Sequence, residues 1–220
     1  MTITILNLLE LSEVGADFAS KLKLSSDPGI ISVIKKVNSF LAGIDMAQMG
    51  ILRKKFSAIG TLDQIFDKLA ELLVAVKLCD DRPTFNEEST GAPDLYLQVS
   101  KKLVEIKRIN ESDDEKSVLE VLEKKKVIVG DSSEELARQA EMVNAVNKKA
   151  DEAITKAIKQ IDNRPGIIYL IYRLDLLGYR ESLVEREKQF RSYCTKRFND
   201  LAMGKPIEFK IEKFNDILLK

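Results

Sequence analysis

The stretch G-A-P-D-L-Y-L-Q-V-S-K-K-L-V-E-I-K-R, from Gly91 to Arg108, predicts two short strands joined by a tight polar turn at residues 100–102. Side chains alternate between the two faces of a strand. On the first strand, this alternation places the polar side chains on one face and the leucines on the other: Asp94, Tyr96 and Gln98 against Leu95 and Leu97. On the second strand, Glu105 and Lys107 share a face. Buried charges need a compensating ion or ligand, so this group indicates a metal site.

The composition is typical of one soluble globular domain, or of one domain with an extension, because 45% of the 220 residues are hydrophobic and 32% are charged. The 35 basic and 35 acidic residues cancel, so nucleic acid would have to be attracted by a local patch. No apolar run reaches the ~18 residues of a membrane span. Residues 1–4 lack the basic segment of a signal peptide. We therefore expect a cytoplasmic protein without a membrane partner.

Histidine is absent from the chain, which excludes Ser-His-Asp and Cys-His catalysis, histidine-ligated zinc and histidine-based nucleases. Cys79 and Cys194 are too few for structural zinc or a disulfide framework, and we expect both to be small buried apolar side chains in a reducing compartment. Neither glycine-rich phosphate-binding pattern is present. Carboxylate and lysine chemistry remains, and hard oxygen ligands favour Mg²⁺ or Mn²⁺.

Residues 1–57 read as helices because apolar residues recur at helical spacing. Asp27 is a predicted N-cap, with Pro28 at the first helical position, and a further helix is predicted from Met46 to Phe56. Five basic residues on these helices form either a solvated face, which we favour, or a contact with nucleic acid: Lys35, Lys36, Arg53, Lys54 and Lys55.

Thr61 and Gln64 match a capping box that opens a strong helix, apolar nearly all round in its second half. Glu71 falls on a side of this helix that ought to be buried. It is either a rim glutamate paired with Lys68 or Lys77, or a further acidic group that reaches the metal site; we favour the second interpretation.

The remaining elements alternate between strands and helices, and residues 110–115 form a polar turn between them. Strands are predicted around residues 83–86, at 127–129 as a strand or connector, at 167–172 and at 207–211, and helices at 116–126, 131–161 and 181–198. The run at 167–172 is continuously apolar, as in a strand buried on both faces. This order predicts an α/β fold, with a central mixed sheet flanked by helices.

One spacing in the chain resembles the motif of the PD-(D/E)XK nuclease superfamily, which has the restriction-endonuclease-like fold: Pro93-Asp94, then ten residues, then Glu105-Ile106-Lys107. The resemblance covers residues 61–172 in element order. It implies a helical N-terminal extension at residues 1–57 and a nuclease domain at 58–220. E-x-K also begins at Glu123 and Glu208, but only Glu105 follows Pro-Asp at the family's distance. The segment 109–131 departs from the family's pattern as an insertion.

The resemblance implies a Mg²⁺- or Mn²⁺-dependent phosphodiesterase that acts on nucleic acid, and we expect an endonuclease rather than an exonuclease, with DNA as its substrate. Asp94 and Glu105 would hold the metal with the Ile106 carbonyl, and Glu71 is the additional candidate acid. Lys107 would orient or deprotonate the attacking water, or stabilise the transition state. Contacts with phosphate are expected from weaker candidates: Lys101, Lys102, Arg108, Lys156, Gln160 and the run Lys124–Lys126.

Two other classes of function stay open. A catalytically silent module of the same fold would bind nucleic acid without cleaving it. A protein-interaction domain would have no salt-dependent affinity for nucleic acid. Many enzymes that this chain resembles are dimers, so a homodimer through the N-terminal helices is a further expectation.

Overall fold

The computed structural model describes residues 3–87, 91–109, 133–172 and 180–213, with only the backbone for 133–142 and 180–183. Its helices are α1 (Ile5–Leu9), α2 (Glu13–Lys23), α3 (Pro28–Ala42), α4 (Met46–Ser57), α5 (Leu62–Lys77), the 3-10 turn η1 (Cys79–Asp81), α7 (Ser133–Ile161) and α8 (Arg180–Leu201). Its strands are β1 (Pro83–Phe85), β2 (Leu95–Leu97), β3 (Leu103–Ile109), β4 (Gly166–Tyr172) and β5 (Ile207–Lys213). The predictions at residues 116–129 and the lysine run Lys124–Lys126 lie outside the described residues.

The five strands form one mixed sheet in the order β1-β2-β3-β4-β5. β1, β2 and β3 pair antiparallel, whereas β3, β4 and β5 run parallel. The register places Leu95 opposite Val104 and Glu105 beside Ile168. This arrangement confirms the predicted α/β class and the mixed sheet flanked by helices.

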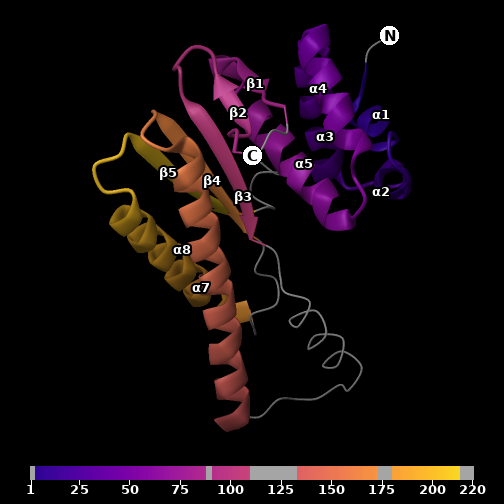
Figure 1. Cartoon of the computed structure of the whole chain (residues 1–220). Coiled ribbons are helices and arrows are strands. Elements are labelled where there is room, and N and C mark those ends of the chain that lie inside the picture. Colours follow the sequence, from indigo (N-terminus) through magenta and orange to yellow (C-terminus); the bar gives the residue numbers. More distant parts are fainter. Residues whose placement is uncertain (1–2, 88–90, 110–132, 173–179, 214–220) are drawn as a thin grey trace.

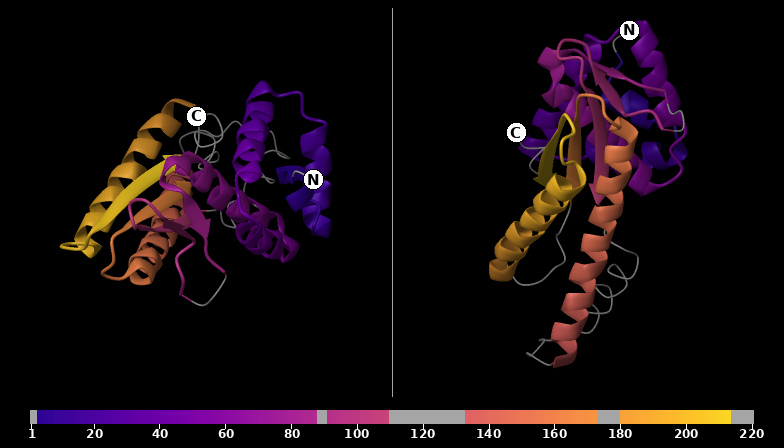
Figure 2. Two further views of the ribbon diagram at one scale, coloured as in Figure 1. Left: turned by 90° about the horizontal axis from the view of Figure 1, so that it is seen from above. Right: turned by 60° about the vertical axis from the view of Figure 1, so that its left-hand side comes forward.

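The sheet separates two layers of helices, which Figure 2 shows from above (left view). One face packs on α5 and on the N-terminal helices α1 to α4, and the other packs on α7 and α8. Alternate residues of β3 enter the two cores, with Val104 and Ile106 in the first, and Leu103 and Ile109 in the second. β4 is buried along its whole length, as its apolar run predicted.

The N-terminal helices share their core with the sheet. Leu8, Leu52 and Phe56 belong to the same buried cluster as Val104 of β3 and Tyr169 of β4. Because this core extends across residue 57, we expect the two predicted regions to fold together.

Short-range signals set the helix boundaries. The Asp27 carboxylate accepts hydrogen bonds from the Gly29 and Ile30 amides, and Thr61 and Gln64 form the predicted capping box. The turn of the hairpin begins earlier than predicted, because β2 ends at Leu97 and residues 98–100 already turn. None of the helices in the described part of the chain is long and apolar enough to cross a membrane.

Candidate functional site

The β2–β3 hairpin brings Asp94 beside Glu105. Leu95 pairs with Val104, and both are fully buried in the core against α5. Alternation therefore turns Glu105 to the face of the sheet opposite Val104, and Asp94 immediately precedes β2. Asp94 Oδ2 also accepts a hydrogen bond of 2.7 Å from the Ile106 amide, which fixes the carboxylate across the two strands.

Glu105 is a fully buried carboxylate, with 0% exposure. Its Oε1 accepts a hydrogen bond from Lys107 Nζ, whereas its Oε2 has no hydrogen-bond partner in the described part of the chain. Burial raises the pKa of Glu105, although the neighbouring Lys107 opposes that rise. A buried carboxylate oxygen without a donor is costly, so Oε2 is open to a cation or a donor.

Asp94 is partly buried, and its environment disfavours ionisation. Burial, together with the charges of Glu71 and Glu105, raises the pKa of Asp94 to about 8; the Ile106 amide and Lys107 act in the opposite direction. A second positive charge near this pair would favour both ionised carboxylates. Strongly perturbed carboxylates that influence one another are typical of functional sites.

Glu71 of α5 combines features of both sequence interpretations. It pairs with Lys68 at 2.9 Å, as the simpler interpretation predicted, but it is buried rather than on a rim. Its second oxygen, Oε2, lies 2.7 Å from Lys55 Nζ, and its charge acts on both Asp94 and Glu105. Lys77 pairs instead with Glu212. Glu71 is thus paired with two lysines, and its charge acts on the carboxylate pair.

The sequence interpretation missed Lys55. We favoured a solvated face for the basic residues of α4, but the Lys55 side chain is only 5% exposed. A signal was present, because Lys55 is adjacent on the helix to the buried residues Leu52 and Phe56, and Met49 continues that face. Its partner could not be read from the sequence, because Glu71 lies on another helix.

The hard oxygen donors fit the chemistry of Mg²⁺ or Mn²⁺. Asp94 and Glu105 are the candidate pair, and Glu105 Oε2 is the oxygen left without a donor. Both oxygens of Glu71 are engaged by lysines. In the described ranges, no three side chains of the acidic, cysteine or histidine type form a group that could hold a metal ion. The donor set is therefore two carboxylates, and Glu71 as a direct ligand stays a prediction.

The weaker candidates lie apart from one another. Arg108 binds Asp67 of α5 at 2.7 Å and stacks on Phe66, so a contact with phosphate would cost these interactions. Lys102 pairs with Glu208. The others are spread over the hairpin turn and the C-terminal turns of α7: Lys101 and Lys156 are exposed, and Gln160 is half-buried. Their role as nucleic-acid contacts stays a prediction.

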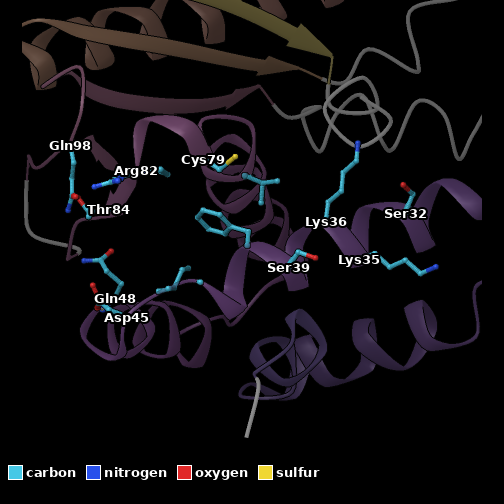
Figure 3. A pocket seen from close by; sticks show the side chains of 15 residues that line it. Ser32, Lys35, Lys36, Ser39, Asp45, Gln48, Cys79, Arg82, Thr84 and Gln98 are labelled. Atoms are coloured by element: carbon cyan, nitrogen blue, oxygen red, sulfur yellow. The ribbon is translucent and has the colours of Figure 1, made fainter.

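A hollow of about 960 Å³ lies between α3 and the β1 edge of the sheet. Figure 3 shows Ser32, Lys35 and Lys36 at one end of the view and Arg82 with Gln98 at the other. Lys35 is exposed, as the predicted solvated face requires.

Cys79 also lines this hollow and is exposed, so its prediction as a buried side chain was wrong, whereas Cys194 is buried as predicted. Cys79 ends up exposed because it opens η1, beyond the last buried turn of α5.

Searches against protein-family models, curated proteins and solved structures gave no match to this chain.

Proposed function

We propose that this protein is a metal-dependent nuclease with a restriction-endonuclease-like core. The observation that carries the proposal is the geometry of the hairpin: the Asp94 carboxylate accepts a hydrogen bond of 2.7 Å from the Ile106 amide, beside the buried Glu105, and Lys107 is bonded to Glu105. The element order supports it: α5 precedes the three antiparallel strands, and α7 leads into a parallel strand beside β3. The PD-(D/E)XK superfamily places its helix, hairpin, helix and strand in that order.

Asp94 and Glu105, with the Ile106 carbonyl, would hold Mg²⁺ or Mn²⁺. When bound, the metal would lower the pKa of a coordinated water and offset charge on the phosphate. The cation would also supply the missing partner of Glu105 Oε2. Of the acids around this pair, Glu71 already has two lysine partners, so its charge does not call for the metal.

Lys107 is the candidate for contact with the reacting groups. Its side chain is 26% exposed although its partner Glu105 is completely buried. The ammonium group has three donors, so it can keep its bond to Glu105 and still donate to an attacking water or to a phosphate oxygen. Whether Lys107 orients the water, removes its proton or stabilises charge is a question for the pH profiles of Lys107 variants.

Cleavage of labelled single-stranded and duplex DNA and RNA in Mg²⁺ and in Mn²⁺ tests the proposal. We expect Asp94→Ala and Lys107→Ala to lower the rate by at least about 100-fold, because each removes a group that acts on the transition state. Lys196→Ala is the matched control, since Lys196 is an exposed cation on α8. Folding is checked by circular dichroism. Cleavage that persists unchanged in either site variant rejects the proposal.

A second candidate function is a catalytically silent nucleic-acid-binding module with the same fold. It is favoured by the commitment of Glu71 to Lys55 and Lys68, which leaves two carboxylates for a metal rather than three. This module would bind the same oligonucleotides without cleaving them in either metal. Its binding would also be insensitive to Asp94→Ala.

A further inference from the structure

The turn between α7 and β4 is held tightly against the start of β3. Asp162 opens it in the left-handed conformation, with a φ of 60°. The Pro165 carbonyl accepts a hydrogen bond of 3.0 Å from the Leu103 amide. Gly166 closes it at a point where a Cβ atom would lie 2.7 Å from the Ile161 side chain. The turn is therefore fixed to the strand that carries Glu105 two residues later.

Arg164 is presented by this turn as an exposed cation. Its Nε donates to the Ile161 carbonyl at 3.2 Å, and one Nη2 donor binds the Gln160 carbonyl at 3.0 Å. These bonds close the C-terminus of α7 and fix the guanidinium plane. A guanidinium has five N–H donors, and Arg164 has no carboxylate partner in the parts of the chain that the structure describes. Several donors thus stay available to an anion.

Arg164 lines a pocket of about 470 Å³ together with residues that neighbour Asp94 and Glu105 along the chain. Pro93 and Tyr96, which flank Asp94 closely in sequence, line the same pocket. Leu103 forms another part of the wall, ~6.6 Å along β3 from Glu105 at 3.3 Å per residue. Figure 1 shows the turn at the end of the sheet where β3 and β4 begin. The pocket therefore extends the candidate site along the hairpin.

The lining residues combine the groups that recognise a nucleotide unit. An arginine fork binds phosphate oxygens through two parallel hydrogen bonds. An aromatic ring stacks on a base regardless of sequence. Among the described residues that line the pocket, Glu87 is the one acid, and it is exposed, so water screens its charge.

We propose that this pocket binds one nucleotide unit of the nucleic-acid strand next to the cleaved bond, with Arg164 on its phosphate and Tyr96 against its base. This inference rests on the proposed function and adds a substrate subsite to it. Glu87 limits the affinity of the subsite, because it opposes the phosphate.

Binding of fluorescein-labelled single-stranded and duplex DNA and RNA to the full chain in EDTA tests the subsite without cleavage. We expect Arg164→Gln to weaken binding about 10-fold, the value of a charge-assisted hydrogen bond. The slope of log K against log salt should fall by about one unit. Glu87→Gln should tighten binding. Tyr96→Leu should weaken binding to single strands several-fold, with its salt slope unchanged.

Arg82→Gln is the matched control, because Arg82 is an exposed arginine in the hollow of Figure 3 and not in this pocket. The inference is overturned if Arg164→Gln binds like the wild type, if Arg82→Gln weakens binding and its slope equally, or if the wild type does not bind nucleic acid. Thermal melts identify a variant that fails to fold. If Arg164→Gln fails to fold, Arg164→Lys, which keeps the charge, serves as the second test.

The subsite and the proposed function fail in distinguishable ways. Binding that depends on Arg164, without cleavage in Mg²⁺ or Mn²⁺, keeps the subsite and rejects the nuclease. Cleavage that is unaffected by Arg164→Gln keeps the nuclease and rejects the subsite.

Discussion

Lys55 Nζ lies 2.7 Å from Glu71 Oε2, in an ion pair whose side chains are 5% and 9% exposed. This pair joins α4, one of the N-terminal helices, to α5. The charge of Glu71 in turn contributes to the raised pKa of Asp94. A buried charge that loses its partner is destabilising. The N-terminal helices therefore contribute a charge to the candidate site as well as apolar surface to its core.

Lys55→Met is expected to lower the free energy of unfolding by about 3 kcal/mol, because it leaves the buried Glu71 carboxylate with Lys68 alone. Urea titration measures the change. Lys54→Met, at an exposed position on the same helix, should stay within about 0.5 kcal/mol of the wild type. The double variant Lys55→Met/Glu71→Gln should recover part of the loss. A loss below about 0.5 kcal/mol in the single variant contradicts the prediction.

Stability in metal-free buffer should fall as the pH rises from 5 to 8. The pKa of Asp94 is raised from 3.8 in an ordinary environment to about 8 in the fold. In this window the unfolded chain has lost that proton while the folded chain keeps it, so the folded state binds more protons and loses stability with rising pH. The raised pKa of Glu105 acts in the same direction.

Urea titrations at pH 5, 6, 7 and 8 measure this dependence. Asp94→Asn keeps the acceptor for the Ile106 amide but removes the titrating carboxyl group. The free energy of unfolding of this variant should therefore change less with pH, and the variant should be more stable than the wild type at pH 8. The lowered pKa values of Asp81 and Glu187 act below this window. A wild type whose stability is flat or rises across the window would refute the assignment.

Mn²⁺ should raise the melting temperature of the wild type by about 3–6 °C at a free concentration ten times its Kd, since ligand binding stabilises the folded state by about 1.4 kcal/mol there. Asp94→Asn and Glu105→Gln should lose most of this shift. Asp17→Asn, an exposed carboxylate on α2, is the control and should retain it. Differential scanning fluorimetry gives the measurement; equal shifts in all four proteins would argue against a site at Asp94 and Glu105.

Gly166→Ala should destabilise the protein by about 1–3 kcal/mol, because its Cβ would overlap the Ile161 side chain and lie 3.1 Å from the Leu103 carbonyl. Gly50→Ala is the opposite case. Nothing lies within 4 Å of a Cβ there, and alanine in a helix interior is expected to stabilise by about 0.5–1 kcal/mol. Thermal or urea unfolding compares the free energies of unfolding of the two variants. Similar changes in Gly166→Ala and Gly50→Ala would disprove the close approach at Gly166.

One thiol per chain should react with Ellman's reagent in the native protein. Cys79 is exposed, whereas Cys194 is buried, and burial with the Asp151 charge raises the pKa of Cys194 to about 12. The thiolate is the reactive form. Cys79→Ser should abolish the fast reaction, and guanidinium should expose the second thiol. Native-state reaction of Cys194 at the rate of Cys79 would contradict its burial.

The sequence by itself determined the features that depend on neighbouring residues. The caps at Asp27 and Thr61, the alternating faces of the hairpin and the buried β4 follow from local hydrogen bonds and from the fixed periods of helix and strand. The juxtaposition of Asp94 and Glu105 was within reach of this reasoning, because a hairpin pairs residues that are close in sequence.

Only the tertiary structure decided which charges meet across elements. The pairing of Lys55 with Glu71 and the place of Arg164 beside Pro93 depend on how α4 and the α7–β4 turn pack on the sheet. The raised pKa of Asp94 depends on burial and on charges from α5. Packing and desolvation involve groups far apart along the chain, and no local period encodes them. The hairpin thus placed the carboxylates, and the surrounding helices determined their chemistry.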